Sequence, residues 1–169
     1  MLEITKENNL QKKDEILYSE WVPTGKIVKI VISIVFILIA SLGIIFTAHL
    51  PIELAFIGLI LGGVCIIIFL LYWNYRGLQI SLTKNQLEVN YGILNHKRIP
   101  LDQITKCDIT KAHFKTYGGV GIRFGVDGSW AYNTDFGDAV KLTLQSGRPF
   151  LFSTKNPQKI CDLLQELLK

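Results

Sequence analysis

The side chains best able to do chemistry in this 169-residue chain are three histidines, three cysteines and several aspartates. A metal site needs ligands at close spacing, and nucleophilic catalysis needs a Ser or Cys beside an activating base. His49, His96 and His113 lie far apart and have no second ligand near them in sequence. No serine occurs in the glycine-flanked turn that carries a hydrolase nucleophile. We therefore predict no catalytic residue, no metal site and no cofactor, and a protein that is not an enzyme.

The cysteines and aspartates fit structural roles. Cys65 falls in a long apolar run, whereas Cys107 and Cys161 lie far apart in the polar part of the chain. An odd number without close spacing predicts free, buried thiols in a reducing compartment rather than a disulfide framework. The aspartates fall mostly in turn sequences, where this residue type makes local hydrogen bonds. They are Asp102, Asp108, Asp127, Asp135 and Asp138.

Three glycines, Gly118, Gly119 and Gly121, suggest a phosphate-binding loop at first sight. Such a loop joins a strand to a helix N-terminus and carries a Lys-Ser or Lys-Thr pair. Here the glycines lead into a strand-like segment without that pair. The pattern therefore favours a bent strand or bulge.

The elements that must position these residues begin with two long apolar runs. Residues 30–48 and 54–73 contain no Asp, Glu, Lys or Arg. Each run is about as long as a helix needs to cross the roughly 30 Å hydrocarbon core of a bilayer. Backbone groups in lipid need internal partners, so both runs must be helices. We predict a membrane α-helical hairpin over residues 26–76.

The flanking charges predict how this hairpin is oriented. Lys26 and Lys29 precede the first helix and Arg76 follows the second, whereas the connecting turn has no Lys or Arg. The positive-inside rule therefore places both termini in the cytoplasm, in a multi-pass cell-membrane protein. The same three basic residues are candidates to face lipid headgroups. The aromatic side chains expected at that interface are Trp21, Tyr72, Trp73 and Tyr75.

Small residues recur at helix-packing spacing in both runs. Gly43 and Thr47 are four residues apart in the first run, and Gly58 and Gly62 are four apart in the second. Such pairs let helix backbones approach closely. Two interpretations remain open, namely packing within the hairpin and contact with a second copy or another protein.

The flanking regions differ in pattern. Residues 1–25 are predicted to be a polar N-terminal tail, either disordered or forming a short interfacial helix. Apolar and polar residues alternate after residue 76, which predicts about seven short strands in a domain over residues 77–169. A final amphipathic helix is expected to close one end of this domain. Its apolar stripe consists of Ile160, Leu163, Leu164, Leu167 and Leu168.

Several motifs in this region are shared with a known kind of domain. They are Leu78–Thr83, Gln86–Gly92, Arg98–Ile104, Tyr117–Arg123, Trp130–Asn133, Gly147-Arg148, and Phe152–Thr154 followed by Pro157. Residues 77–169 resemble a bacterial pleckstrin-homology-like (PH-like) domain of the membrane-anchored kind. The resemblance implies a mainly-β barrel or sandwich of about seven strands capped by a C-terminal α-helix, after a two-helix transmembrane hairpin.

Together these features predict a membrane-anchored interaction or scaffold module. Besides the lipid bilayer, its expected partner is another protein or a second copy at the cytoplasmic membrane face. The alternatives are a sensor of anionic lipid headgroups and an accessory subunit of a membrane complex. The net charge of +4 comes without the dense Lys and Arg clustering of nucleic-acid binders, so no nucleic acid is expected.

One segment is the preferred candidate for the interaction surface. Glycines expose backbone groups that can accept a strand from another chain, and Arg, Trp and Tyr most often carry interface energy. The competing interpretation is structural, with Trp130 and Tyr132 filling the barrel and the glycines relieving crowding. The candidate residues are Tyr117, Gly118, Gly119, Gly121, Arg123, Trp130, Tyr132 and Asn133.

Overall fold

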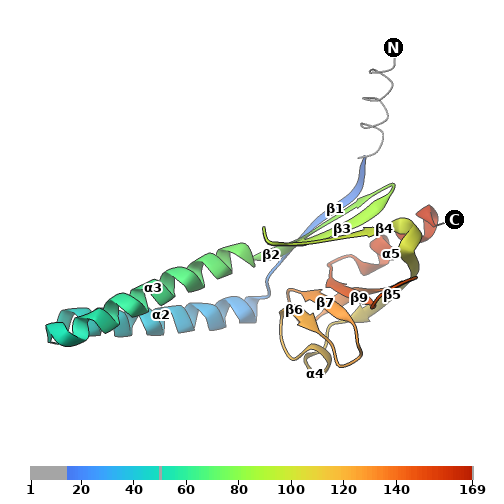
Figure 1. Ribbon diagram of the computed structural model, residues 1–169. Coiled ribbons are helices and arrows are strands. Elements are labelled where there is room, and N and C mark those ends of the chain that lie inside the picture. The colour runs from blue at the N-terminus through green and yellow to red at the C-terminus, as the bar shows by residue number, and fades with distance from the viewer. Residues whose placement is uncertain (1–14, 50, 169) are drawn as a thin grey trace, which may run out of the picture. The chain divides into compact units, whose positions relative to one another are not determined.

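The computed structural model describes residues 15–49 and 51–168, and it divides into two compact units. One unit is the segment Thr24–Arg76. The other combines the chain before it, up to Pro23, with the chain after it, from Gly77 onward. The first is a helical hairpin and the second is built mainly from strands (Figure 1).

The helical unit consists of α2 (Lys26–His49) and α3 (Ile52–Asn74), which run side by side (Figure 1). Both helices are long and apolar enough to cross a membrane. Only 6% and 11% of the residues in their most apolar windows are buried. Core helices of a soluble protein would be mostly buried, so the exposed apolar surface suits a lipid environment. The predicted hairpin is confirmed.

The other unit begins with β1 (Ile16–Pro23), which pairs antiparallel with β2 (Gly77–Thr83). The prediction of a polar tail over residues 1–25 is therefore wrong for β1, while residues 1–14 lie outside the described part. The inward positions of β1 include Tyr18 and Glu20. Their polar groups interrupt the apolar alternation by which a strand is predicted, although every second residue is buried.

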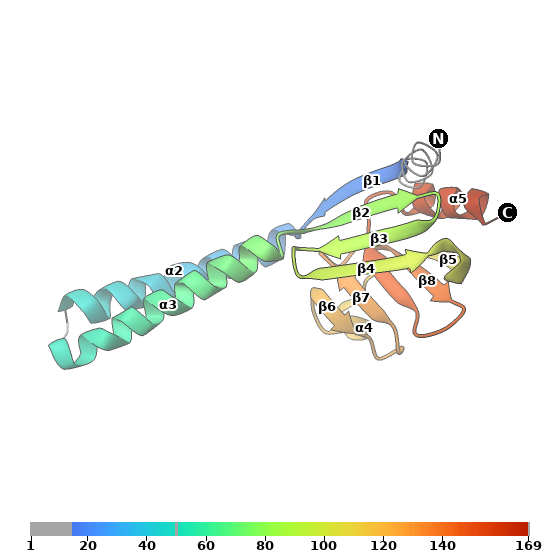
Figure 2. The same ribbon diagram turned by 45° about the horizontal axis from the view of Figure 1, so that its top comes forward.

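Nine strands in the described residues form two sheets, and eight of them fall in residues 77–169, where about seven were predicted. The first sheet has the order β1-β2-β3-β4, and Figure 2 shows these strands side by side. Its last two members are β3 (Gln86–Tyr91) and β4 (Asn95–Pro100). The second sheet has the order β5-β8-β9-β7-β6, in which β7 and β9 are parallel. Its members are β5 (Ile104–Lys111), β6 (Gly121–Phe124), β7 (Trp130–Asn133), β8 (Asp138–Leu144) and β9 (Phe150–Ser153).

Apolar side chains from both sheets form the core of this unit. Two short helical turns, η1 (Leu101–Gln103) and α4 (Phe114–Tyr117), connect strands. The largest fully buried side chains come from β2, β3, β4, β8, β9 and the last helix. They include Tyr91, Phe150, Phe152, Leu78, Ile80, Leu82, Leu87, Leu142 and Leu164. The mainly-β domain with a C-terminal helix is confirmed.

The last helix, α5 (Pro157–Leu167), packs on β5 and β8. It buries Ile160 and Leu164 of the predicted stripe, whereas Leu168 is 40% exposed. Cys161 of α5 forms a disulfide with Cys107 of β5, at a Cα–Cα distance of 5.6 Å. The prediction of three free thiols is therefore wrong for this pair. Their sequence separation of 54 residues carries no signal, because helix-on-sheet packing brings them together.

A buried carboxylate ties β1 to the chain just before α5. Glu20 accepts hydrogen bonds from the Tyr18 hydroxyl (2.9 Å), the Thr154 hydroxyl (2.6 Å) and the Lys155 backbone N–H (2.8 Å). The Lys155 ammonium group in turn donates to the Trp21 carbonyl oxygen at 3.0 Å. Residues from the two ends of the sequence therefore form one hydrogen-bonded cluster.

Candidate functional site

The candidate surface is arranged around β6, the last strand of the five-stranded sheet. β6 pairs with β7 on one side, with Gly121 opposite Asn133 and Phe124 opposite Trp130. Within residues 15–49 and 51–168, no strand pairs with its other side. An open strand edge presents backbone N–H and C=O groups that another strand can use.

Glycines shape the turn that leads into this edge. Gly118 has φ of 66° and ends α4, where its N–H donates to the Phe114 carbonyl oxygen at 2.7 Å. Gly121 has φ of 107°, in the region that favours glycine, and it begins β6. A strand and not a helix follows, so these glycines serve turn geometry and do not form a phosphate loop.

Two of the predicted surface residues lie in the interior. Asn133 is fully buried, and its amide nitrogen donates to the Gly119 carbonyl oxygen at 3.0 Å. Tyr117 is also buried, and its hydroxyl is 2.9 Å from the Ser129 hydroxyl. The Asn133 amide nitrogen and the Tyr117 hydroxyl have hydrogen-bond partners in the loop, which lowers the cost of burial, whereas the Asn133 Oδ1 atom is buried without a partner among the described residues. Tyr117 and Asn133 therefore position the loop and are not contact residues.

Arg123 and Trp130 remain at the surface. The Nε of Arg123 donates to the Val120 carbonyl oxygen at 3.1 Å, which folds the side chain over Gly119. Trp130 is 46% exposed. The competing interpretation, in which Trp130 fills the barrel, is therefore wrong for this residue.

A pocket of about 280 Å³ opens beside β6. Its lining comes from β4, β6, β7 and β9, so it lies between the open edges of the two sheets. Tyr132 belongs both to this pocket and to the core, because its ring is 5.1 Å from Phe150 and 6.1 Å from Tyr91. The lining residues are Lys97, Ile122, Trp130, Tyr132 and Phe150.

Aromatic rings and a guanidinium extend the pocket wall along the edge. The rings of Phe124 and Trp130 meet edge to face at 5.5 Å. The guanidinium carbon of Arg148 lies 4.6 Å from the centre of the Phe124 ring, in cation–π range. Sequence reasoning missed Ile122, Phe124 and Phe150 at this site, because only the pairing of the sheets gathers them.

The turn between β6 and β7 is held by a charged network. Asp127 accepts hydrogen bonds from the Lys141 ammonium (2.7 Å), the Ser129 hydroxyl (2.6 Å) and the Ser129 N–H (3.1 Å). Burial opposes ionisation of Asp127, but these hydrogen bonds outweigh it and lower the pKa to about 2. Burial raises the pKa of the neighbouring Tyr117 hydroxyl. Hydrogen bonds join all of these side chains in one network, which fixes the turn between β6 and β7.

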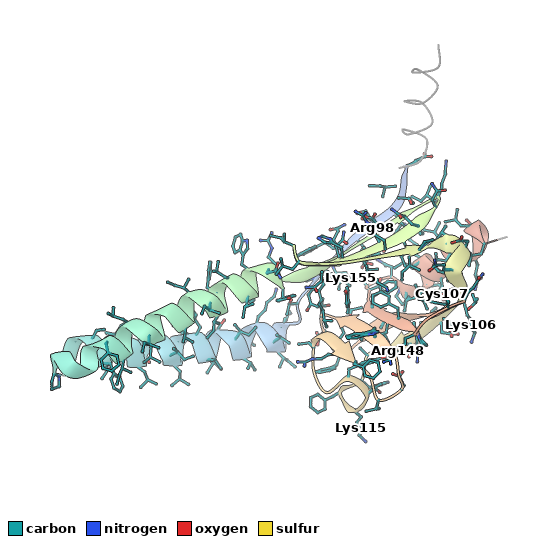
Figure 3. The ribbon with its side chains drawn as sticks, in the orientation of Figure 1. Arg98, Lys106, Cys107, Lys115, Arg148 and Lys155 are labelled. Carbon is teal, nitrogen blue, oxygen red and sulfur yellow. A yellow bond between two sulfur atoms is a disulfide. The ribbon has the colours of Figure 1, made fainter. Side chains whose placement is uncertain are left out.

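Basic side chains of the β-rich unit are dispersed over several elements (Figure 3). Some are paired, since Arg98 contacts Glu88 at 3.1 Å and Lys106 contacts Asp108 at 2.7 Å. Among the described residues, no group of three or more His, Cys, Asp and Glu side chains could hold a metal ion. The basic residues labelled in Figure 3 are Arg98, Lys106, Lys115, Arg148 and Lys155.

The candidate helix-packing residues belong to the hairpin unit. A Cβ atom on Gly58 would lie 2.3 Å from the Thr47 Cγ2 atom and 2.7 Å from the Gly43 carbonyl oxygen. These three residues therefore meet where α2 and α3 touch. Gly62 faces open space. At the end of α3, the Arg76 guanidinium lies 4.7 Å from the Trp73 ring centre.

Comparison with known proteins agrees with this architecture. No curated protein matches the chain. The model of the family described as "Bacterial PH domain" (bPH_2) matches residues 27–144, a segment that includes both helices of the hairpin and most of the β-rich unit. The match covers more than half of the sequence and confirms the resemblance drawn from its motifs. The chain belongs to the bacterial PH domain family.

Proposed function

We propose that this protein is a membrane-anchored, non-enzymatic interaction module whose β6 edge binds an extended segment of a partner protein. One observation carries this proposal: β6 lies at a sheet edge directly beside an aromatic pocket. A strand added to β6 would gain main-chain hydrogen bonds, and the pocket would select one of its side chains. A second copy of this chain is the alternative source of that strand.

The lining of the site suggests which segment it would bind. Rings and an aliphatic side chain form most of the pocket wall, which suits an aromatic or long aliphatic side chain. The only charged residue in the lining is Lys97. Arg123 and Arg148 lie along the same edge. An extended segment with one large apolar residue and neighbouring acidic residues would complement this surface.

The distribution of basic side chains is evidence against the main alternative function, a sensor of anionic lipid headgroups. A sensor of anionic headgroups needs several Lys or Arg side chains around one opening of the domain. Apart from Lys97, Arg123 and Arg148 at the β6 edge, the basic side chains come from several elements, and Arg98 and Lys106 are already paired with carboxylates. Headgroup sensing and a role as accessory subunit therefore rank below binding of a strand.

We place this edge on the cytoplasmic side. Lys26, Lys29 and Arg76 support this orientation, because Lys and Arg near the ends of membrane helices set topology during insertion. The Cys107–Cys161 disulfide points to the opposite orientation, because disulfides persist mainly in oxidising compartments. Reporter fusions at both termini should give cytoplasmic signals, and an external signal from either would overturn the orientation.

The partner site can be tested with Arg123→Ala combined with Trp130→Ala in the full-length chain. Both side chains are at the surface, so the melting temperature should stay within a few degrees of the parent value. Affinity purification in mild detergent should lose the partner recovered with the parent chain. Ile109→Ala is the matched control, because it truncates a half-exposed residue on β5, the opposite edge of the same sheet. Equal recovery with the double variant would contradict the proposal.

A further inference from the structure

The two ends of the four-stranded sheet differ in their surface chemistry. The turn between β2 and β3 carries the polar residues Lys84 and Asn85. The turn between β3 and β4 carries Ile93 and Leu94, whose exposed fractions are 74% and 75%. Gly92, with φ of 71°, already supplies the left-handed conformation that this turn requires. Turn geometry therefore does not explain two neighbouring aliphatic side chains at the tip.

The apolar turn lies at the end of the sheet where the chain enters and leaves the hairpin. Pro23, the last residue of β1, is opposite Gly77, the first residue of β2. In the next pairs, Leu78 lies opposite Tyr91, and Tyr91 lies opposite Asn95. The turn that joins β3 to β4 is therefore at the same end as Pro23 and Gly77 (Figure 2). Adjacent strands are about 4.8 Å apart, so the turn lies about 5–10 Å sideways from Gly77 on β2 and about 10–14 Å from Pro23 on β1.

Two further contacts characterise this end of the sheet. The Trp21 ring covers Gly77, where an added Cβ would lie only 2.4 Å from the Cζ2 atom of the indole. Trp21 nevertheless remains 42% exposed. The Nε2 of His96 is 2.6 Å from the Ile93 carbonyl oxygen and can donate to it, which fixes the turn. The sheet thus presents a tryptophan and two aliphatic side chains next to the point where the hairpin begins.

We propose that Ile93 and Leu94 insert into the interface of the bilayer that the hairpin spans, with Trp21 beside them at the headgroup level. Leu and Ile side chains suit the acyl boundary, and Trp is enriched just outside it. The segment from Tyr91 to Asn95 has no charged side chain, so the contact needs no anionic lipid. This contact is separate from the β6 edge and would hold the domain against the membrane at a third point besides its two covalent connections.

The proposal can be tested on the full-length chain in phosphatidylcholine nanodiscs. Leu94→Cys and Lys84→Cys would each be labelled with an environment-sensitive fluorophore, while the unsubstituted chain measures background labelling. Lys84 is the matched control, since β3 separates the two turns by about 20 Å. Spin-labelled lipids should quench the label at position 94 several-fold more strongly than the label at position 84. A water-soluble quencher should show the opposite order.

Three results would overturn the proposal. The first is equal lipid quenching at positions 94 and 84. The second is quenching at position 94 only when anionic lipid is added, which would indicate headgroup attraction instead. The third result comes from a control for the fluorophore, in which Ile93→Ser is added to the Leu94→Cys chain. Unchanged lipid quenching in that chain would show that the fluorophore, and not the native turn, enters the bilayer.

Discussion

Individual side chains in this protein show why polar residues are the hardest to place from sequence. Glu20 and Asn133 look like surface residues by type, yet both are buried and their polar atoms hold backbone groups. Whether a polar side chain is buried depends on partners far away in the chain, such as Thr154 for Glu20. Local sequence contains no record of such partners, whereas the burial of Leu and Ile follows from their type alone.

Replacing Glu20 should destabilise the β-rich unit markedly. Glu20→Ala would leave the Thr154 hydroxyl and the Lys155 N–H without their acceptor, at a cost of roughly 2–4 kcal/mol of unfolding free energy. Urea denaturation followed by tryptophan fluorescence would measure this loss. Glu88→Gln is the control, because its partner Arg98 is largely exposed and such ion pairs contribute under about 1 kcal/mol. Equal effects of the two substitutions would contradict the role of Glu20.

The Asp127 network predicts a loss of stability in acid. The pKa of Asp127 is about 2 in the folded protein, below its ordinary value of 3.8. The folded state therefore favours the ionised form, and this stabilisation is present above pH 4 and lost as the pH falls towards 2. The carboxylate is about one-third exposed, so the loss should be only about 1 kcal/mol. Asp127→Asn should flatten that part of the pH profile, and an unchanged profile would contradict the assignment.

Among the secondary-structure elements, those with an uninterrupted pattern were predicted correctly. The hairpin has continuous apolar composition and α5 has a single apolar stripe, so both can be recognised within one segment. β1 could not be recognised from the sequence, because the polar groups of Tyr18 and Glu20 lie on its inward face. The pocket beside β6 could not be predicted from the sequence either, because its lining also comes from β4 and β9, which are distant from β6 in the chain.

The disulfide that attaches α5 to β5 should contribute several kcal/mol to the stability of the fold. The Cys107–Cys161 bond closes a loop of 54 residues, and restricting the unfolded chain in this way stabilises a fold by roughly 4 kcal/mol. Replacing both cysteines with serine should therefore lower the unfolding free energy by several kcal/mol. Cys65→Ser is the control, because Cys65 lies in α3 and forms no disulfide. Alkylation of the denatured, unreduced chain should detect one free thiol, and three would contradict the bond.

At the scale of the whole molecule, the β-rich unit is interrupted in sequence but continuous in its sheet. The hairpin is inserted between β1 and β2, two neighbouring strands of the first sheet. Pairing of Pro23 with Gly77 therefore brings both connections of the hairpin to one end of that sheet. A binding event at β6 would occur on a domain with two covalent connections to the apolar hairpin, which restrict its motion more than a single linker would.

This arrangement predicts that the hairpin can be replaced by a tight turn. Joining Pro23 to Gly77 through Asn-Gly would convert β1 and β2 into an ordinary two-residue hairpin, because these residues are already register partners. The resulting chain, residues 15–23 followed by the turn and residues 77–169, should be soluble and unfold cooperatively. Circular dichroism should show mainly β structure with one helix.

The matched comparison is a chain of residues 77–169 alone, which lacks β1. Without β1 the edge of β2 is open, and the donors at Thr154 and Lys155 lose the Glu20 carboxylate. Open edges invite association, and unpaired buried donors cost stability. The shorter chain should therefore aggregate or melt well below the turn-linked chain. If both chains are monomeric and melt at the same temperature, β1 does not stabilise the β-rich unit, and the prediction is contradicted.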